Sequence, residues 1–276
     1  MFSILLKDNI EEGIIMNKII AILVINLAAV MLFEFLGWLV SLKKKNVTIA
    51  DSMWGAGFII ITWLTFILGD GYLVRNVIIT VPVTIWGLRL SYHITRRSIG
   101  KPEDPRYTEW RNEYGNKFPV VSLFRVFLVQ GLFMWLIALS IQLAQLFPRP
   151  ESLTLADYAG LGIWVIGFII ESSADRQLAH FIKDPANRGR VMRYKLWRYS
   201  RHPNYFGEAT IWWGIYVICC ATEYGFLTII SPMLITYTLL KITGVSLMEQ
   251  TMFKGNAEYE DYKRTTSSFI PWFPGK

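Results

Sequence analysis

The stretch from Arg201 to Glu208 reads Arg-His-Pro-Asn-Tyr-Phe-Gly-Glu and is the densest group of chemically capable side chains in the sequence. Pro203 suits the first turn of a helix, where a backbone N–H is not needed. The N–H groups of that turn and the helix dipole favour an anion, and Arg201 and His202 add cationic donors beside it. Asn204 and Glu208 are four residues apart, so they share one helix face. We predict an anion site at a helix start, followed by an amide and a carboxylate suited to a ribose or a carboxamide.

Further ionisable side chains lie near the same ends of other apolar segments. Buried charges at membrane depth are costly and usually face a polar cavity or each other. We therefore interpret the group as one functional site rather than as isolated charges. Its members are Arg89, His93, Glu171, Asp175, Arg176, His180, Lys241 and Glu249.

The elements that carry these residues are long apolar blocks. Only 18% of the 276 residues are charged, against about 25% in a typical soluble domain. About 20 apolar residues of helix span the ~30 Å hydrocarbon core, and a helix pairs its backbone groups within one segment. We predict an all-α, polytopic integral membrane protein with seven transmembrane helices in a single membrane-embedded domain, residues 1–276. The predicted helices are Asn17–Leu42, Ile49–Leu68, Tyr72–Thr95, Ser122–Phe147, Ala156–Phe181, Asn204–Ala221 and Gly225–Glu249.

The basic residues predict how the helices cross the membrane. Of the 28 Lys and Arg residues, 21 lie after the first, third, fifth and seventh helices, and four lie in the segments on the other side. Basic loops stay in the cytoplasm, so we expect the N-terminus outside and the C-terminus inside. These charges also suit anionic membrane lipids. Aromatic and turn residues interleave with them, as in residues 193–203, which favours an anionic ligand on that face as well.

Several classes of site are excluded. The three histidines are far apart in sequence and form no ligand pair, and Cys219 and Cys220 are adjacent inside an apolar segment, where small core side chains are the simpler interpretation. No Gly-x-Gly-x-x-Gly follows a strand, which excludes a Rossmann domain. We expect no metal and no nucleic-acid partner.

Four segments together carry a resemblance to a known family: Arg201–Glu208, Asp175–Leu178, Asp104–Tyr107 and Glu260–Tyr262. They resemble the bacterial branch of the steroid 5α-reductase family, from about Asp51 onward. The resemblance implies a seven-helix enzyme of the bacterial inner membrane that binds NADPH on its cytoplasmic side. Such an enzyme reduces the carbon–carbon double bond of an enone, for example a 4-ene-3-oxo steroid, that enters from the lipid. A monomer is compatible with this scheme, in which residues 156–276 form mainly the cofactor side.

The resemblance also implies roles for individual residues. Asp175 would contact the cofactor, Asn204 and Glu208 its nicotinamide end, and Trp212 would lie on the same helix face. The mammalian enzymes have a Gln-Glu pair near the start of helix two, where this chain has Asp51-Ser-Met-Trp54. We expect Tyr92 to donate to the enone carbonyl with Asp51 as its orienting partner, and Glu34 to line the same cavity. The full predicted cofactor set is Arg89, His93, Arg96, Arg97, Glu171, Asp175, Lys183, Arg193, Tyr199, Arg201, His202, Asn204, Tyr205, Glu208, Trp212, Glu249, Tyr259 and Tyr262.

Two other classes of protein stay open. The Arg-His-Pro-x-Tyr-x-Gly-Glu pattern also occurs in membrane methyltransferases that use S-adenosylmethionine, such as the isoprenylcysteine carboxyl methyltransferases. Those carry a Glu-Glu pair late in the last helix, where this chain has Met248-Glu-Gln250. Its many cytoplasmic arginines suit the phosphates of NADPH better than a cationic cofactor. A transporter or scaffold is the third class, and the odd helix number without an inverted repeat argues against it.

Overall fold

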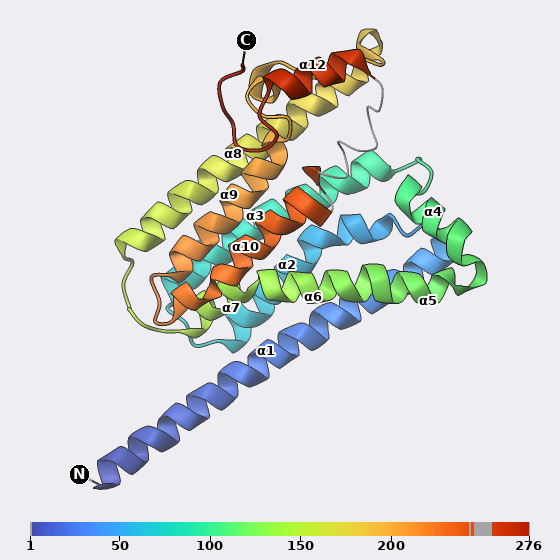
Figure 1. Cartoon of the computed structure of the whole chain (residues 1–276). Coiled ribbons are helices and arrows are strands. Elements are labelled where there is room, and N and C mark those ends of the chain that lie inside the picture. The colour runs from blue at the N-terminus through green and yellow to red at the C-terminus, as the bar shows by residue number, and fades with distance from the viewer. Residues whose placement is uncertain (1, 243, 246–255, 276) are drawn as a thin grey trace. The chain divides into compact units, whose positions relative to one another are not determined.

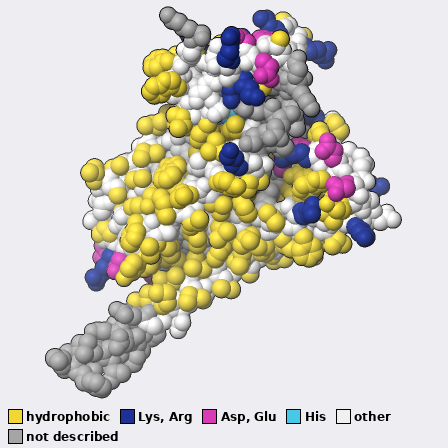
Figure 2. Space-filling model, in the orientation of Figure 1, with side chains coloured by type: hydrophobic (Ala, Val, Ile, Leu, Met, Phe, Trp, Pro, Cys, Tyr) yellow, Lys and Arg dark blue, Asp and Glu magenta, His cyan; other side chains and the backbone are white. Residues whose placement is uncertain are grey.

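A computed structural model describes residues 2–242, 244–245 and 256–275, and the side chains of residue 13 and of residues from 15 onward within these ranges. All regular segments in the described part are helical (Figure 1). The prediction of an all-α, polytopic membrane protein is confirmed. On the face drawn in Figure 2, hydrophobic side chains cover most of the helices, and charged side chains gather in separate patches, as expected for helices that contact lipid.

Within the described residues, six helical segments rather than the predicted seven are long and apolar enough to cross a membrane. The difference is α9 (Pro203–Cys219), whose 17 residues rise only about 25 Å. Predicted helix seven also differs, because its described part consists of a 3-10 turn η5 (Gly225–Ile229), α10 (Ile230–Tyr237) and a π-helical turn η6 (Thr238–Ile242). Its predicted end at Glu249 lies outside the described residues. The six spans are Ile15–Lys44, Ile49–Leu68, Leu73–Ser98, Pro105–Ile137, Leu155–Lys183 and Gly225–Ile242.

The contacts divide the chain into two compact units, residues 1–153 and residues 154–276. We call them unit 1 and unit 2. The predicted single domain stays a prediction. Unit 1 contains α1 (Phe2–Lys44), α2 (Ile49–Leu68), α3 (Leu73–Ser98), α4 (Pro105–Tyr114), η1 (Gly115–Lys117), α5 (Phe118–Ser122), η2 (Leu123–Leu128), α6 (Val129–Ile137) and α7 (Leu139–Leu146). Helix α2 packs on both α1 and α3.

The fourth predicted helix is longer than expected and is interrupted. Charges between residues 105 and 125 suggested a loop, but α4 already begins at Pro105, where the Asp104 side chain accepts a hydrogen bond from the Arg106 N–H. Apolar surfaces explain the helix, because Tyr107 is buried and Trp110 packs beside it in the core of unit 1. The chain then continues through η1, α5, the π-helical η2 and α6 to a break at Ala138.

Unit 2 is organised by an antiparallel pair of long helices, α8 (Leu155–Lys183) and α9 (Figure 1). Glycines let the two backbones approach. A Cβ added to Gly160 would lie 2.6 Å from the Gly214 oxygen, and one added to Gly167 would lie 2.7 Å from the Gly207 oxygen. Each helix therefore repeats a glycine after seven residues on the contact face, about two helical turns apart. The short η3 (Pro185–Asn187), η4 (Lys195–Arg198) and α12 (Ala257–Thr265) complete the unit with η5, α10 and η6.

The charge asymmetry makes the topology testable. We expect reporter fusions after Lys101 and after Lys195 to report the cytoplasm, and a fusion after Arg149 to report the outside, because basic segments resist translocation. Paired alkaline phosphatase and green fluorescent protein fusions in a bacterial host measure this. If Lys101 and Lys195 lie in opposite compartments, one of the two predicted crossings between them, Pro105–Ile137 or Leu155–Lys183, is absent and the predicted orientation is wrong.

Candidate functional site

The start of α9 packs on α8, and this contact brings two predicted site residues, Asn204 and Asp175, together. Asn204 Nδ2 donates a hydrogen bond to Asp175 Oδ1 over 3.2 Å. Asp175 and Glu208 are both buried, each 7% exposed. Gly207 permits this approach, because a Cβ there would lie 2.8 Å from the Glu171 Cβ. An amide of α9 and a carboxylate of α8 are therefore brought together, although 29 residues separate Asp175 from Asn204 in sequence.

The carbonyl oxygen of Asn204 is the notable atom of this cluster. Its amide nitrogen is engaged by Asp175, but Oδ1 is buried and has no hydrogen-bond partner among the described residues. Buried polar atoms are nearly always paired. An oxygen of this kind at a helix start therefore suits a ligand that brings an N–H or O–H donor.

Arg201 and His202, which precede the helix, have structural contacts. The Arg201 guanidinium donates to the Lys263 oxygen at 2.6 Å and to the Thr266 oxygen at 3.2 Å. The His202 ring stacks on Tyr205, with ring centres 5.6 Å apart. Arg201 therefore ties the C-terminal segment to the start of α9.

The C-terminal helix α12 packs on the loop that precedes α9. Asn256 caps it by accepting hydrogen bonds from the N–H groups of Glu258 and Tyr259. The Tyr262 hydroxyl donates to the carbonyls of Trp197 and Ser200. Tyr259 and Tyr262, predicted as cofactor contacts, thus pack the basic loop against α12. Trp212 and Glu171 are buried in the hairpin, Tyr199 contacts Phe273, and Glu249 lies outside the described residues.

The basic side chains of unit 2 fall into two groups. Arg193 and Arg264 both bind Asp261, at 3.0 and 2.9 Å, and their hydrogen bonds hold the pKa of that carboxyl below its usual value. The second group is exposed and has no side-chain partner within the described part of the chain. It consists of Arg176, Lys183, Arg188, Arg190, Lys195 and Arg198.

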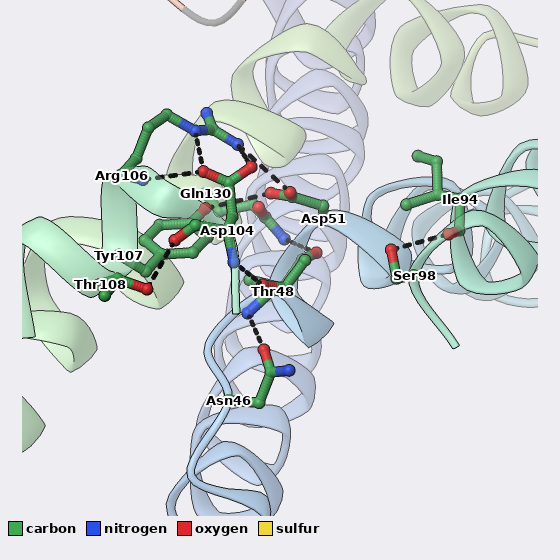
Figure 3. Close-up of polar contacts among 11 residues, drawn as sticks. Asn46, Thr48, Asp51, Ile94, Ser98, Asp104, Arg106, Tyr107, Thr108 and Gln130 are labelled. Carbon is green, nitrogen blue, oxygen red and sulfur yellow. Dashed lines mark hydrogen bonds and ion pairs between the residues drawn. The ribbon is translucent and has the colours of Figure 1, made fainter. Parts of the chain in front are cut away.

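In unit 1, the predicted pairing of Tyr92 with Asp51 is not formed. Tyr92 is 65% exposed and its hydroxyl accepts a hydrogen bond from Arg96. Asp51 instead accepts from the Tyr107 hydroxyl at 3.0 Å and from Arg106 at 3.4 Å (Figure 3). Pro105 lies at the start of α4, which carries both Arg106 and Tyr107. Of the other predicted residues on α3, Arg89 and His93 are half-buried, and Arg96 and Arg97 are exposed.

The connection before α4 is held by further polar contacts. Glu103 accepts hydrogen bonds from Arg111 and from the Val47 N–H, at 2.8 and 2.7 Å, and the Asp104 N–H donates to Thr48 (Figure 3). Burial raises the pKa of Glu103, but the hydrogen bonds from Arg111 and Val47 outweigh it and hold the pKa below its ordinary value. The carboxylate is therefore charged at neutral pH and fixes α4 to the end of α1.

These features define a polytopic, all-α membrane protein with a hydrogen-bonded polar pair, Asp175 and Asn204, where one helix of a close-packed hairpin begins. Residues 37–266 match the family described as "Protein of unknown function (DUF1295)", and the chain belongs to that family. An uncharacterized protein of the fission yeast Schizosaccharomyces pombe is 25% identical over 270 residues, which cover 86% of this chain and 76% of the yeast protein. No solved structure matches the chain.

Proposed function

We propose that the protein binds NADPH at the start of α9 and reduces the carbon–carbon double bond of an apolar enone, such as a 4-ene-3-oxo steroid. The observation that carries this proposal is the buried Asn204 oxygen beside Asp175. A nicotinamide carboxamide brings the N–H donor that this oxygen needs. The resemblance of Arg201–Glu208 to the steroid 5α-reductase family supports the same ligand.

The charges around the helix start suit the rest of the cofactor. The pyrophosphate of NADPH would lie at the N–H groups of the first turn of α9. Its 2′-phosphate would bind exposed guanidinium groups such as those of Arg188, Arg190 and Arg198. Arg201 contributes by fixing the C-terminal segment beside the site.

When bound, NADPH supplies a hydride for the β-carbon of the enone. The protein would hold the nicotinamide through Asn204, with Asp175 fixing the orientation of that amide. A hydrogen-bond donor at the substrate carbonyl stabilises the enolate charge as it develops, and a proton at the α-carbon completes the saturated ketone. Tyr92 stays the predicted donor to the carbonyl, whereas Asp51 binds Tyr107 and Arg106.

A titration of the detergent-solubilised protein with NADPH, NADH and S-adenosylmethionine tests this proposal. We expect NADPH to bind more tightly than NADH, and the difference to shrink with added salt because the arginines are exposed. Arg190→Gln should reduce the preference for NADPH, and Arg149→Gln, in the segment predicted outside, should not. Equal affinity for NADPH and NADH in the wild type would contradict the role of the arginines. Binding of S-adenosylmethionine alone would replace the reductase with the methyltransferase alternative.

A further inference from the structure

Glu34 is a carboxyl group in the middle of a membrane-spanning helix. It belongs to α1 and is fully buried. Gln130 of α6 donates from Nε2 to Glu34 Oε1 at 3.1 Å, and the same nitrogen donates to the Ala50 carbonyl of α2 at 2.8 Å. One amide thus joins three helices of unit 1 around this acid.

The second oxygen of Glu34 is buried and has no hydrogen-bond partner among the described residues. No ion pair joins Glu34 to a Lys or Arg in that part of the chain either. A carboxylate without a cation is costly at membrane depth, so the neutral acid is favoured. A neutral carboxyl has one O–H donor. Since Oε1 accepts from Gln130, the proton belongs on Oε2, where it requires an acceptor.

Methionine side chains lie on the three helices that Gln130 joins. Methionines lie against glycines on all three helices: a Cβ on Gly37 would clash with Met53, and one on Gly57 would clash with Met134. A Cβ on Gly131 would lie 3.2 Å from both the Glu34 Cγ and the Met31 sulfur. Methionine side chains are unbranched and readily change shape around a guest. Met31 beside Glu34, and Met53 and Met134 on the neighbouring glycines, can therefore adjust their side chains to an apolar molecule.

We propose that Glu34 and Gln130 form a ligand site within the membrane for the carbonyl or hydroxyl oxygen of an apolar molecule. Glu34 is a neutral acid there and donates its O–H to the ligand oxygen. Gln130 fixes the orientation of the carboxyl, and Met31, Met53 and Met134 rearrange around the hydrocarbon part. The site needs no cofactor, so its ligand binding can be measured separately from the proposed reductase activity.

Two substitutions of Glu34 separate donation from structure. Glu34→Gln keeps a donor and an acceptor of similar shape, and Glu34→Leu removes both. The probes are androst-4-en-3-one and androstane, a hydrocarbon of related shape without oxygen, titrated without NADPH. We expect the wild type and Glu34→Gln to bind the ketone more tightly than the hydrocarbon. In Glu34→Leu the ratio of the two affinities should fall about tenfold, which corresponds to the free energy of one hydrogen bond. A thermal melt confirms that each variant is folded.

Infrared spectroscopy provides a second readout of the proton on Glu34. At neutral pH, the wild type should show the C=O stretch of a protonated carboxyl group that Glu34→Gln lacks, and the ketone should shift that band. A carboxylate signal in its place, or an unchanged ketone preference in Glu34→Leu, overturns the site. Ketone binding without NADPH binding supports this site and refutes the reductase, whereas NADPH binding with no ketone preference refutes this site alone.

Discussion

Gly214→Leu is expected to unfold the α8–α9 hairpin or to lower its melting temperature strongly. A Cβ at this position would lie 2.6 Å from the Trp164 nitrogen and 2.7 Å from the Gly160 oxygen. Both neighbours are backbone atoms, which cannot move aside as a flexible side chain can. Overpacking typically lowers the free energy of unfolding by about 1–3 kcal/mol and occasionally by more. We expect a loss near the upper value for a leucine placed between two helix backbones. Thermal melting of the solubilised protein measures the loss.

Gly162→Leu is the matched control, because Gly162 lies on α8, the other helix of the hairpin, and a Cβ there would have no neighbour within 4 Å. We expect this control to melt like the wild type. The hairpin also sets the distance between Asp175 and Asn204, so Gly214→Leu should lose NADPH binding together with its stability. If Gly214→Leu and Gly162→Leu melt at the same temperature, close backbone packing does not hold the hairpin.

Helices were the part of the fold that the sequence predicted well. Apolar blocks of about 20 residues leave the backbone few alternatives in lipid, and α2 runs over the predicted residues Ile49–Leu68. The prediction missed α4 because its charges suggest a loop. Arg106 and Arg111 are accommodated only when the folded chain supplies Asp104 and Glu103 as partners. These hydrogen bonds are visible in the folded structure, whereas the helical periodicity of the sequence does not indicate them.

The candidate site was likewise predicted from the sequence only in part. The spacing of Asn204 and Glu208 predicts a shared helix face, but the contact with Asp175 depends on how closely two helices pack. Gly207 decides that distance, and an isolated glycine in an apolar segment is a weak signal. Tyr92 was chosen from its helix position, yet Tyr107 reaches Asp51 because the turn before α4 directs it there. Partners of a side chain are therefore the least predictable feature, because they depend on contacts across the fold.

Asn204→Asp is expected to reduce NADPH affinity by about one to two decades. It removes the hydrogen bond from Asn204 to the Asp175 carboxylate, which orients the Asn204 side chain toward the cofactor. A hydrogen bond to a charged partner contributes roughly 1.5–3 kcal/mol. The substitution keeps the size of the side chain but replaces the amide donor with a second carboxylate, 3.2 Å from Asp175 Oδ1 in the wild type. Like charges at this distance repel, which adds to the loss. Because the nicotinamide would also be displaced, hydride transfer should slow further.

An exchange of the two side chains provides the decisive control. Combining Asp175→Asn with Asn204→Asp leaves one carboxylate and one amide at the same two positions, so the hydrogen bond can form with donor and acceptor reversed. We expect the exchange to recover part of the NADPH affinity that Asn204→Asp loses, and to restore its melting temperature. Asn204→Ala, which removes both the amide donor and the Oδ1 acceptor without adding charge, should also lose NADPH affinity and should not be rescued by Asp175→Asn. If folded Asn204→Asp binds NADPH as tightly as the wild type, the cofactor is not held at this pair, and the start of α9 serves another purpose.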